Sequence, residues 1–217
     1  NLEGRKVLLR LDLNVPLTAQ GEVADDFRIR KALPTLNFLR ERGALVRAVS
    51  HIDGSGASLR PVADHMVRRL GIALTFVPAL DHPQTALVVA RQSARELVLF
   101  ENIRREGGEE TNDPALAERL AALGDIYVND AFSVSHRAHA SIIGVPKLLS
   151  SYAGLQFADE VGHLSEAFDP PRPLIFIIGG IKFETKLPLV RKFLDIADRV
   201  FVCGALANDI FKARGLS

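Results

Sequence analysis

The sequence predicts an α/β protein built on a parallel sheet, and two observations support this prediction. Short apolar runs of strand length alternate with longer segments of helical periodicity along most of the 217 residues. Several of these runs also end in polar side chains, as strands of an open parallel sheet do where they supply a binding site. We therefore predict a doubly wound, parallel-sheet N-terminal domain, an interdomain helix and the opening β-α units of a second α/β domain.

The elements of the first domain, residues 1–152, alternate from the amino end. Asp25 or Asp26 is expected to cap the first helix, and Asp113 with Pro114 to begin the last one. Residues 84–96 fit either a helix or an irregular connection. The strands are expected at 6–13, 44–50, 73–77, 97–100 and 126–128, and the helices at 27–42, 59–70 and 114–123.

Polar side chains follow four of the predicted strands at the point where each strand ends. Because the carboxyl ends of parallel strands share one edge of the sheet, these side chains are expected to lie near one another. Guanidinium groups bind phosphate and carboxylate bidentately, so the pattern is typical of a site for a small anion. The residues are Asp12, Asn14, His51, Arg104, Asn129, Asp130, His136, Arg137 and His139.

The segment after the fifth strand has a second interpretation. Asn129 and Asp130 are also suitable helix caps, and residues 136–139 would then be solvated surface. Arg28 is a separate functional candidate, because it falls in the first turn of its own helix, where a cation opposes the helix dipole.

A second domain is expected after the proline-rich break at residues 169–173. Residues 153–172 are predicted to form the interdomain helix and linker, and residues 173–217 to begin the next domain. We expect the chain to be a fragment, because it starts without methionine and stops soon after a helix-like segment.

Two glycines, Gly179 and Gly180, stand between a strand and a helix of this second domain. Phosphate can approach backbone N–H groups at such a helix N-terminus. Lys182 and Lys186, one helical turn apart, strengthen the prediction of a phosphate site. The segment is not the Gly-x-x-x-x-Gly-Lys-Ser/Thr loop of P-loop proteins.

The composition is that of a globular protein, with 47% hydrophobic and 24% charged residues. A net charge of +1 gives no signal for nucleic acid or an anionic membrane, so neither is expected as a partner. The single cysteine, Cys203, predicts a reducing, cytoplasmic location. No apolar run approaches the length of a membrane helix.

Ordered motifs along nearly the whole chain resemble those of the phosphoglycerate kinase family. They are Arg10-Leu-Asp-Leu-Asn-Val-Pro-Leu17, Asp26-Phe-Arg-Ile-Arg30, Ala32-Leu-Pro-Thr35, Ser50-His51, Glu101-Asn-Ile-Arg104, Gly108-Glu-Glu110, Asn112-Asp-Pro114, Val128-Asn-Asp-Ala-Phe132, His136-Arg-Ala-His-Ala-Ser141 and Gly179-Gly-x-Lys182. The resemblance implies reversible phosphoryl transfer between ATP and 3-phosphoglycerate, giving ADP and 1,3-bisphosphoglycerate, by a monomeric glycolytic enzyme that uses Mg²⁺. The family's later segments, with the expected magnesium ligand, are absent, so we assign no metal ligand and expect the chain to be inactive alone.

The resemblance also implies roles for individual residues. Asp12 and Asn14 would hold the glycerate end of the substrate, and the basic residues would take its phosphate. Arg28 and Lys182 would be catalytic and contact the transferring phosphoryl group from opposite domains. The basic residues are His51, Arg104 and Arg137, supported by His136 and His139; the residues implied around the nucleotide are Gly179, Gly180, Lys182, Lys186 and Gly204.

The chain departs from the family pattern at two places. Where the family has Ser-His-Leu-Gly-Arg-Pro, this chain has Ser50-His-Ile-Asp-Gly-Ser55, so Gly54 replaces a phosphate-binding arginine. Losing one such contact costs about 1.5–3 kcal/mol, and Arg60 and Arg105 are the candidates to compensate. The family's adenine-side Gly-Gly-Gly is Cys203-Gly204-Ala205 here.

Two other hypotheses remain open. The missing arginine motivates a truncated or diverged module that binds phosphoglycerate-like anions without kinase activity. A generic α/β nucleotide-binding domain, such as that of a dehydrogenase, is disfavoured because no Gly-x-Gly-x-x-Gly follows the first strand.

Overall fold

The computed structural model describes residues 1–54, 56–181 and 183–215. The chain divides into two compact units, Asn1–Glu160 and Val161–Ser217. The division falls within a helix, whereas the sequence predicted an interdomain segment over residues 153–172. Those finer boundaries stay a prediction, and the two units are described separately.

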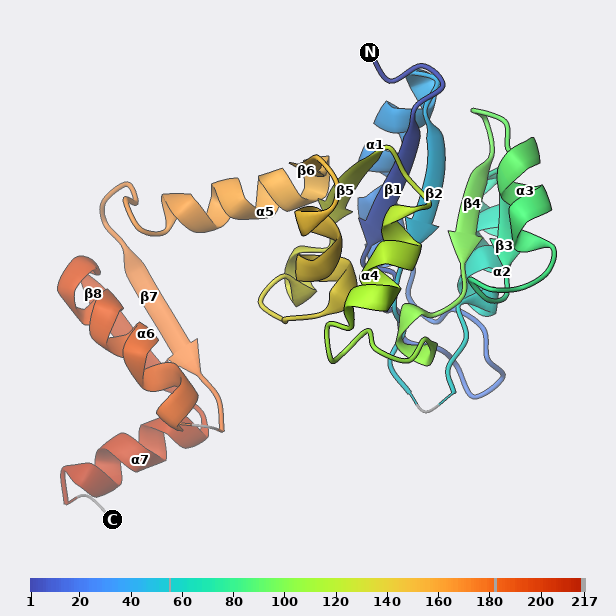
Figure 1. Ribbon diagram of the computed structural model, residues 1–217. Helices are drawn as coiled ribbons and strands as arrows, with labels where there is room; N and C mark the ends of the chain where they lie inside the picture. Colours follow the sequence, from blue (N-terminus) through green and yellow to red (C-terminus); the bar gives the residue numbers. More distant parts are fainter. Residues whose placement is uncertain (55, 182, 216–217) are drawn as a thin grey trace. The chain divides into compact units, whose positions relative to one another are not determined.

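The first unit contains a six-stranded sheet in the order β3-β4-β2-β1-β5-β6 (Figure 1). Every pair of neighbouring strands is parallel, which confirms the predicted sheet. The sequence missed only the short edge strand β6. The strands are β1 Lys6–Leu11, β2 Leu45–Val49, β3 Leu74–Val77, β4 Leu97–Phe100, β5 Ile126–Asp130 and β6 Ser151–Ala153.

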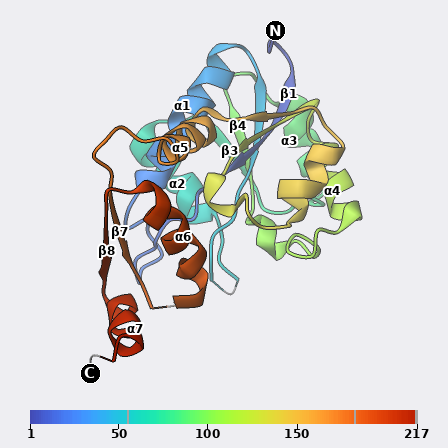
Figure 2. The same ribbon diagram turned by 90° about the vertical axis from the view of Figure 1, so that its left-hand side faces the viewer.

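Helices cover both faces of this sheet, as Figure 2 shows. Side chains alternate along β1, so that Leu9 packs beneath α1 and α2 while Leu8 packs beneath α4 on the opposite face. Both layers are fully buried, which explains why the strands are continuously apolar in sequence. The helices are α1 Phe27–Glu41, α2 Arg60–Leu70, α3 Thr85–Arg91 and α4 Pro114–Ala121.

Short helical turns connect the strands near their carboxyl ends. Three of them follow β5: the 3₁₀ turns Phe132–Val134 and Val145–Lys147, and the single π-turn Ala140–Gly144 between them. A further 3₁₀ turn, Ile103–Arg105, follows β4. The sequence did not predict these turns, because contacts far along the chain hold them; the Ala140 N–H, for example, donates to the Glu109 carbonyl over 2.9 Å.

Helix α5, Leu155–Glu166, begins against the end of β5. The Asp130 carboxylate accepts a hydrogen bond from the Phe157 N–H at 3.0 Å, and the Thr35 hydroxyl accepts one from the Leu155 N–H at 2.9 Å. These acceptors satisfy N–H groups that a helix start leaves open. Asp130 therefore caps a helix that lies 25 residues further along the chain.

Gly154 leaves no room for a side chain at this junction, because a Cβ there would lie 2.6 Å from the Asp130 Cβ. We expect Gly154→Ala to lower the free energy of unfolding by about 1–3 kcal/mol, since Asp130 must move from the helix start. Gly162, within the same helix, has open space around it and is the matched control. Gly162→Ala should instead raise stability by about 0.5–1 kcal/mol, and equal effects in denaturant unfolding would contradict the packing argument.

The second unit pairs two parallel strands, β7 Ile175–Gly179 and β8 Arg199–Cys203, with helices α6 Phe183–Ile196 and α7 Ala205–Ala213. One face of the strands packs on the helices: Ile178 contacts Val190 and Leu206. On the opposite face of these two strands, the side chains of Ile177 and Phe201 are at least half exposed. These are the predicted opening β-α units of a second α/β domain.

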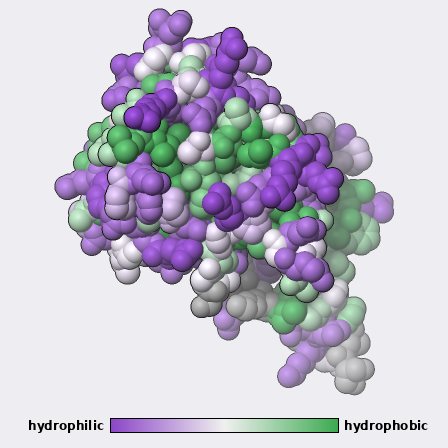
Figure 3. Space-filling view, turned by 90° about the vertical axis from the view of Figure 1, so that its right-hand side faces the viewer, coloured by the Kyte–Doolittle hydropathy of each residue, from purple (hydrophilic) through white to green (hydrophobic). Residues whose placement is uncertain are grey.

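The surface seen from the β3 side is mostly hydrophilic, with smaller hydrophobic areas between the polar side chains (Figure 3). Within the described ranges, none of the helices combines the length and apolar character needed to cross a bilayer.

Candidate functional site

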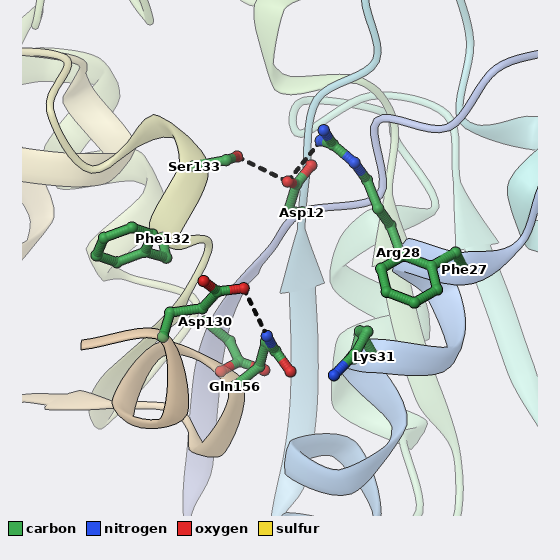
Figure 4. A pocket seen from close by; sticks show the side chains of 10 residues that line it. Asp12, Phe27, Arg28, Lys31, Asp130, Phe132, Ser133 and Gln156 are labelled. Atoms are coloured by element: carbon green, nitrogen blue, oxygen red, sulfur yellow. Dashed lines mark hydrogen bonds and ion pairs between the residues drawn. The ribbon is translucent and has the colours of Figure 1, made fainter. Parts of the chain in front are cut away.

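A pocket of about 270 Å³ lies where the sheet changes direction of winding. The chain passes from β1 to β2 on one side, and later returns to add β5 on the other side of β1. The gap between the carboxyl ends of such strands is where open α/β sheets bind ligands. The pocket is lined by Asp12, Phe27, Arg28, Lys31, Ala32, Asp130, Phe132, Ser133, Gln156 and Glu160 (Figure 4).

Asp12 and Arg28 form the polar centre of this pocket (Figure 4). Arg28 Nη1 lies 2.6 Å from Asp12 Oδ2, and the Ser133 hydroxyl donates to the same oxygen at 2.7 Å. Burial raises the pKa of Asp12, but the hydrogen bond from Ser133 and the charge of Arg28 outweigh it, so the pKa lies below its ordinary value. The pocket therefore holds an ionised carboxylate beside a guanidinium that is 45% exposed.

A second group of polar side chains, from the segments after β1, β2 and β4, lies next to Asp12, whose Oδ1 accepts a hydrogen bond from the Asn14 N–H at 3.2 Å. Asn14 Nδ2 donates to Asp53 Oδ2 at 2.7 Å, and the Asp53 N–H donates to Asn14 Oδ1 at 2.9 Å. The Arg104 guanidinium also donates to the Asp53 carboxylate. Asn14 and Arg104 are thus brought together, and the sequence did not anticipate that Asp53 joins them.

His51 lies behind this group and is only 2% exposed. Arg10 Nη2 lies 3.2 Å from His51 Nδ1, which places the acceptor nitrogen of the imidazole toward the guanidinium. Burial, and then the charges of Arg10 and Arg104, lower the pKa of His51 to about 3. His51 is therefore neutral at physiological pH and serves as a polar support rather than as a cation.

This neutral state predicts a pH effect. The ring signals of His51 in NMR spectra should not titrate between about pH 8 and about pH 5, and a midpoint near the ordinary histidine value of about 6.5 would contradict the prediction. Below about pH 6.5, His51 binds a proton in the unfolded chain but stays unprotonated in the folded protein. This residue should therefore reduce stability by up to about 1.4 kcal/mol per pH unit as the pH falls toward 3.

The His-Arg-Ala-His group separates in space. His136 and Arg137 are exposed, whereas His139 is buried with its Nδ1 3.8 Å from Glu109 Oε1. Burial is the main cause that lowers the pKa of His139, and the charges of Arg104 and Arg137 add to it. Arg104 and Arg137 are therefore both close enough to His139 to affect its charge.

Asn129 supports part of the alternative interpretation. Its Oδ1 accepts a hydrogen bond from the Ala131 N–H at 3.0 Å, so Asn129 caps the local turn. Ser133, which holds Asp12, was missed by sequence reasoning; its only signal was its place just after β5.

Neither candidate replacement for the missing arginine points into the site. Arg105 Nη1 bonds Glu101 Oε2 at 3.0 Å, and the Arg60 guanidinium lies 4.8 Å from the centre of the Phe76 ring. Both groups are engaged elsewhere in this structure.

The glycines of the second unit that were predicted to lie at a nucleotide or phosphate site are found at the ends of strands. Gly179 pairs in register with Cys203, and the Leu206 N–H donates to the Gly180 carbonyl at 3.1 Å. A Cβ on Gly179 would lie 2.8 Å from the Cys203 sulfur, so the close strand pairing requires glycine there. Gly204 and Gly180 both have positive φ, 63° and 145°, which favours glycine.

Lys186 extends toward these glycines, since its Cε would lie 3.5 Å from a Cβ on Gly180. Lys182, our predicted catalytic lysine, lies outside the described residues. Among residues 1–54, 56–181 and 183–215, no cluster of three or more His, Cys, Asp or Glu side chains suits a metal ion.

Fold and site together define an α/β protein with a cluster of polar and cationic side chains at the switch point of its first sheet. The sequence model of the phosphoglycerate kinase family matches residues 1–217. The chain belongs to the phosphoglycerate kinase family.

Curated relatives and solved structures agree with this assignment. The chain is 40% identical to the phosphoglycerate kinase of Herpetosiphon aurantiacus over 97% of its own length, and 41% identical to that of Maricaulis maris over 100%. Among solved structures, phosphoglycerate kinase from Coxiella burnetii matches with a TM-score of 0.84 at 36% identity, and that from Pyrococcus horikoshii with 0.88 at 26%. Both structural matches cover 100% of this chain and 56–57% of the other.

The chain spans about half the length of the relatives that it matches, 55% of each of the two curated proteins.

Proposed function

We propose that this chain provides the 3-phosphoglycerate site and part of the nucleotide site of a phosphoglycerate kinase. The enzyme transfers a phosphoryl group reversibly between ATP and the carboxylate of 3-phosphoglycerate. The observation that carries the proposal is the convergence of Asp12 and Asn14 after β1, Arg104 after β4 and Arg28 on α1, in a chain of this family.

Each side chain has a role that its chemistry suits. Asn14 and the ionised Asp12 bind the hydroxyl and orient the glycerate end. Arg104 and Arg137 bind the phosphate, because guanidinium bonds phosphate oxygens bidentately. His51 accepts a hydrogen bond from Arg10 and thereby holds the neighbouring loop in place.

Arg28 is the catalytic cation of this half. Phosphoryl transfer depends on positioning and on neutralising charge on the equatorial oxygens, which an exposed guanidinium beside the pocket can do. We assign Lys182 the corresponding role from the nucleotide side. The site must also exclude water, because water would hydrolyse the acyl phosphate.

The nucleotide is ATP or ADP, held by the backbone at Gly179, Gly180 and Gly204 and by Lys186. Mg²⁺ accompanies the nucleotide phosphates and neutralises part of their charge. We assign no residue of this chain to the metal. The proposal includes a monomeric, cytoplasmic enzyme with small-molecule substrates.

The test is an assay of the full-length protein for ATP-dependent phosphorylation of 3-phosphoglycerate, together with titration of each substrate into this chain. Turnover by the full-length protein, and binding of 3-phosphoglycerate without turnover by the chain alone, are expected. A folded full-length protein that neither binds nor phosphorylates 3-phosphoglycerate would refute the proposal.

One observation favours a second function, that of an anion-binding module without kinase activity. Gly54 stands where the family has an arginine, and neither Arg60 nor Arg105 replaces it. Binding of 3-phosphoglycerate by a full-length protein that shows no turnover would select this alternative.

A further inference from the structure

The loop after β2 places a negative charge inside the proposed phosphate site. Asp53 stands where the family pattern has glycine, next to Gly54 in the arginine position. Its carboxylate bonds both Asn14 and Arg104, two of the residues to which we assign substrate. The substitutions therefore remove one cation from the site and add an anion to it.

The contacts of Asp53 are those expected of a bound anion. One carboxylate oxygen, Oδ1, accepts from the Arg104 guanidinium, and the other, Oδ2, accepts from the Asn14 amide at 2.7 Å. Arg104 is mostly buried, with 17% of its side chain exposed, whereas the Asp53 side chain is 64% exposed. A solvent-exposed carboxylate is thus paired with a largely buried guanidinium.

The other acidic neighbour of Arg104 behaves differently. Glu110 Oε1 lies 3.6 Å from Arg104 Nε, beyond hydrogen-bonding distance, and Nε has no hydrogen-bond partner among the described residues. Arg104 therefore has an unpaired N–H donor at Nε, while its Nη1 donates to the Asp53 carboxylate.

We propose that Asp53 is a built-in competitor for the phosphate of the substrate: its carboxylate occupies Arg104 and Asn14 in the free protein and leaves them when a phosphate group binds. This inference rests on the proposed function, because the competing ligand is the phosphate of 3-phosphoglycerate. Partly exposed ion pairs contribute little to folding, so Asp53 can leave Arg104 without loss of the fold.

The competitor lowers affinity in two ways. The phosphate must displace the carboxylate from Arg104, and the displaced carboxylate remains on the same short loop, where it repels a dianion. Two like charges a few ångströms apart repel each other even in water, and more strongly near a protein surface. The protein should therefore bind 3-phosphoglycerate with a weaker affinity than the loss of the arginine alone would cause.

The experiment is calorimetric titration of this 217-residue chain with 3-phosphoglycerate and, separately, with inorganic phosphate at constant ionic strength. Asp53→Asn keeps the size of the side chain and removes its charge, and Asp53→Ala removes the carboxylate altogether. Both variants should bind both ligands roughly tenfold more tightly than the wild type, with the difference shrinking as salt is added. Thermal unfolding of each variant verifies that the fold is kept.

Glu110→Gln is the matched control, because it removes an equal charge beside the same guanidinium but keeps the contact between Asp53 and Arg104. It should change either affinity by no more than about twofold. Equal gains from Asp53→Asn and Glu110→Gln would show a general charge effect and overturn the competitor.

The remaining outcomes separate this inference from the proposed function. If the wild type binds 3-phosphoglycerate and Asp53→Asn binds it equally or more weakly, Asp53 is not a competitor, and the proposed function stands. If no variant binds 3-phosphoglycerate, the proposed function fails on its substrate side. Tighter binding of inorganic phosphate by Asp53→Asn would then still support the competitor.

Discussion

Replacing Arg28 with alanine in the full-length protein is expected to lower kcat by about 10³-fold or more, with a much smaller change in KM for 3-phosphoglycerate. Arg28 projects from the first turn of α1, and its partner Asp12 is fixed separately by Ser133. Removing the guanidinium should therefore leave the pocket intact but take away the positive charge to which we assign stabilisation of the transition state. Steady-state kinetics with varied 3-phosphoglycerate measure both constants.

Arg30 provides the control, since it lies two residues away on the same helix. Its Nε lies 2.8 Å from Asp26 Oδ1, and its side chain is 60% exposed outside the pocket. Arg30→Ala should leave kcat within about twofold of the wild type, as expected for a surface substitution. A rise in KM with unchanged kcat in Arg28→Ala would instead mean that Arg28 only binds the substrate.

The positions of five strands along the chain, their parallel pairing and the polar residues that follow them were predictable from local sequence. Continuous apolar runs such as residues 97–100 are typical of strands buried on both faces, and the polar residues that follow them mark the carboxyl ends. Asp12 and Arg104 were found in this way because each stands immediately after a strand.

Side-chain partners were not predictable, because they join residues that are distant in the chain. Asp130 was expected to take part in an anion site or to cap a following helix; it caps α5, but the sequence did not show that this helix begins 25 residues further along the chain. His51 was grouped with the basic residues, but its burial keeps it neutral. Asp53 looked like a loop residue until the fold brought Asn14 and Arg104 to it.

The buried network beneath the site was also invisible in the sequence. Arg10 and Glu109 are 0% and 1% exposed, and Ser141 lies between them. Arg10 Nε donates to the Ser141 hydroxyl at 3.0 Å, and the Ser141 N–H donates to Glu109 Oε2 at 2.9 Å. Burial lowers the pKa of Arg10, while the negative charge of Glu109 opposes that shift.

We expect Glu109→Gln to lower the free energy of unfolding by about 3–5 kcal/mol, because it leaves the buried charge of Arg10 without its counter-charge. Denaturant unfolding of this chain, with the unfolding of the first unit followed separately, measures the effect. Glu110→Gln is the control: its side chain is 62% exposed, so the change should stay within about 0.5 kcal/mol.

The double variant Arg10→Met with Glu109→Gln tests the cause. If the cost arises from an uncompensated buried charge, removing Arg10 as well should restore a large part of the lost stability, giving a coupling energy of at least about 1 kcal/mol. The same cycle should change the environment of His51, because Arg10 is its hydrogen-bond partner. Losses that simply add in the double variant would show that the two side chains act independently, and that the network stabilises the fold by packing alone.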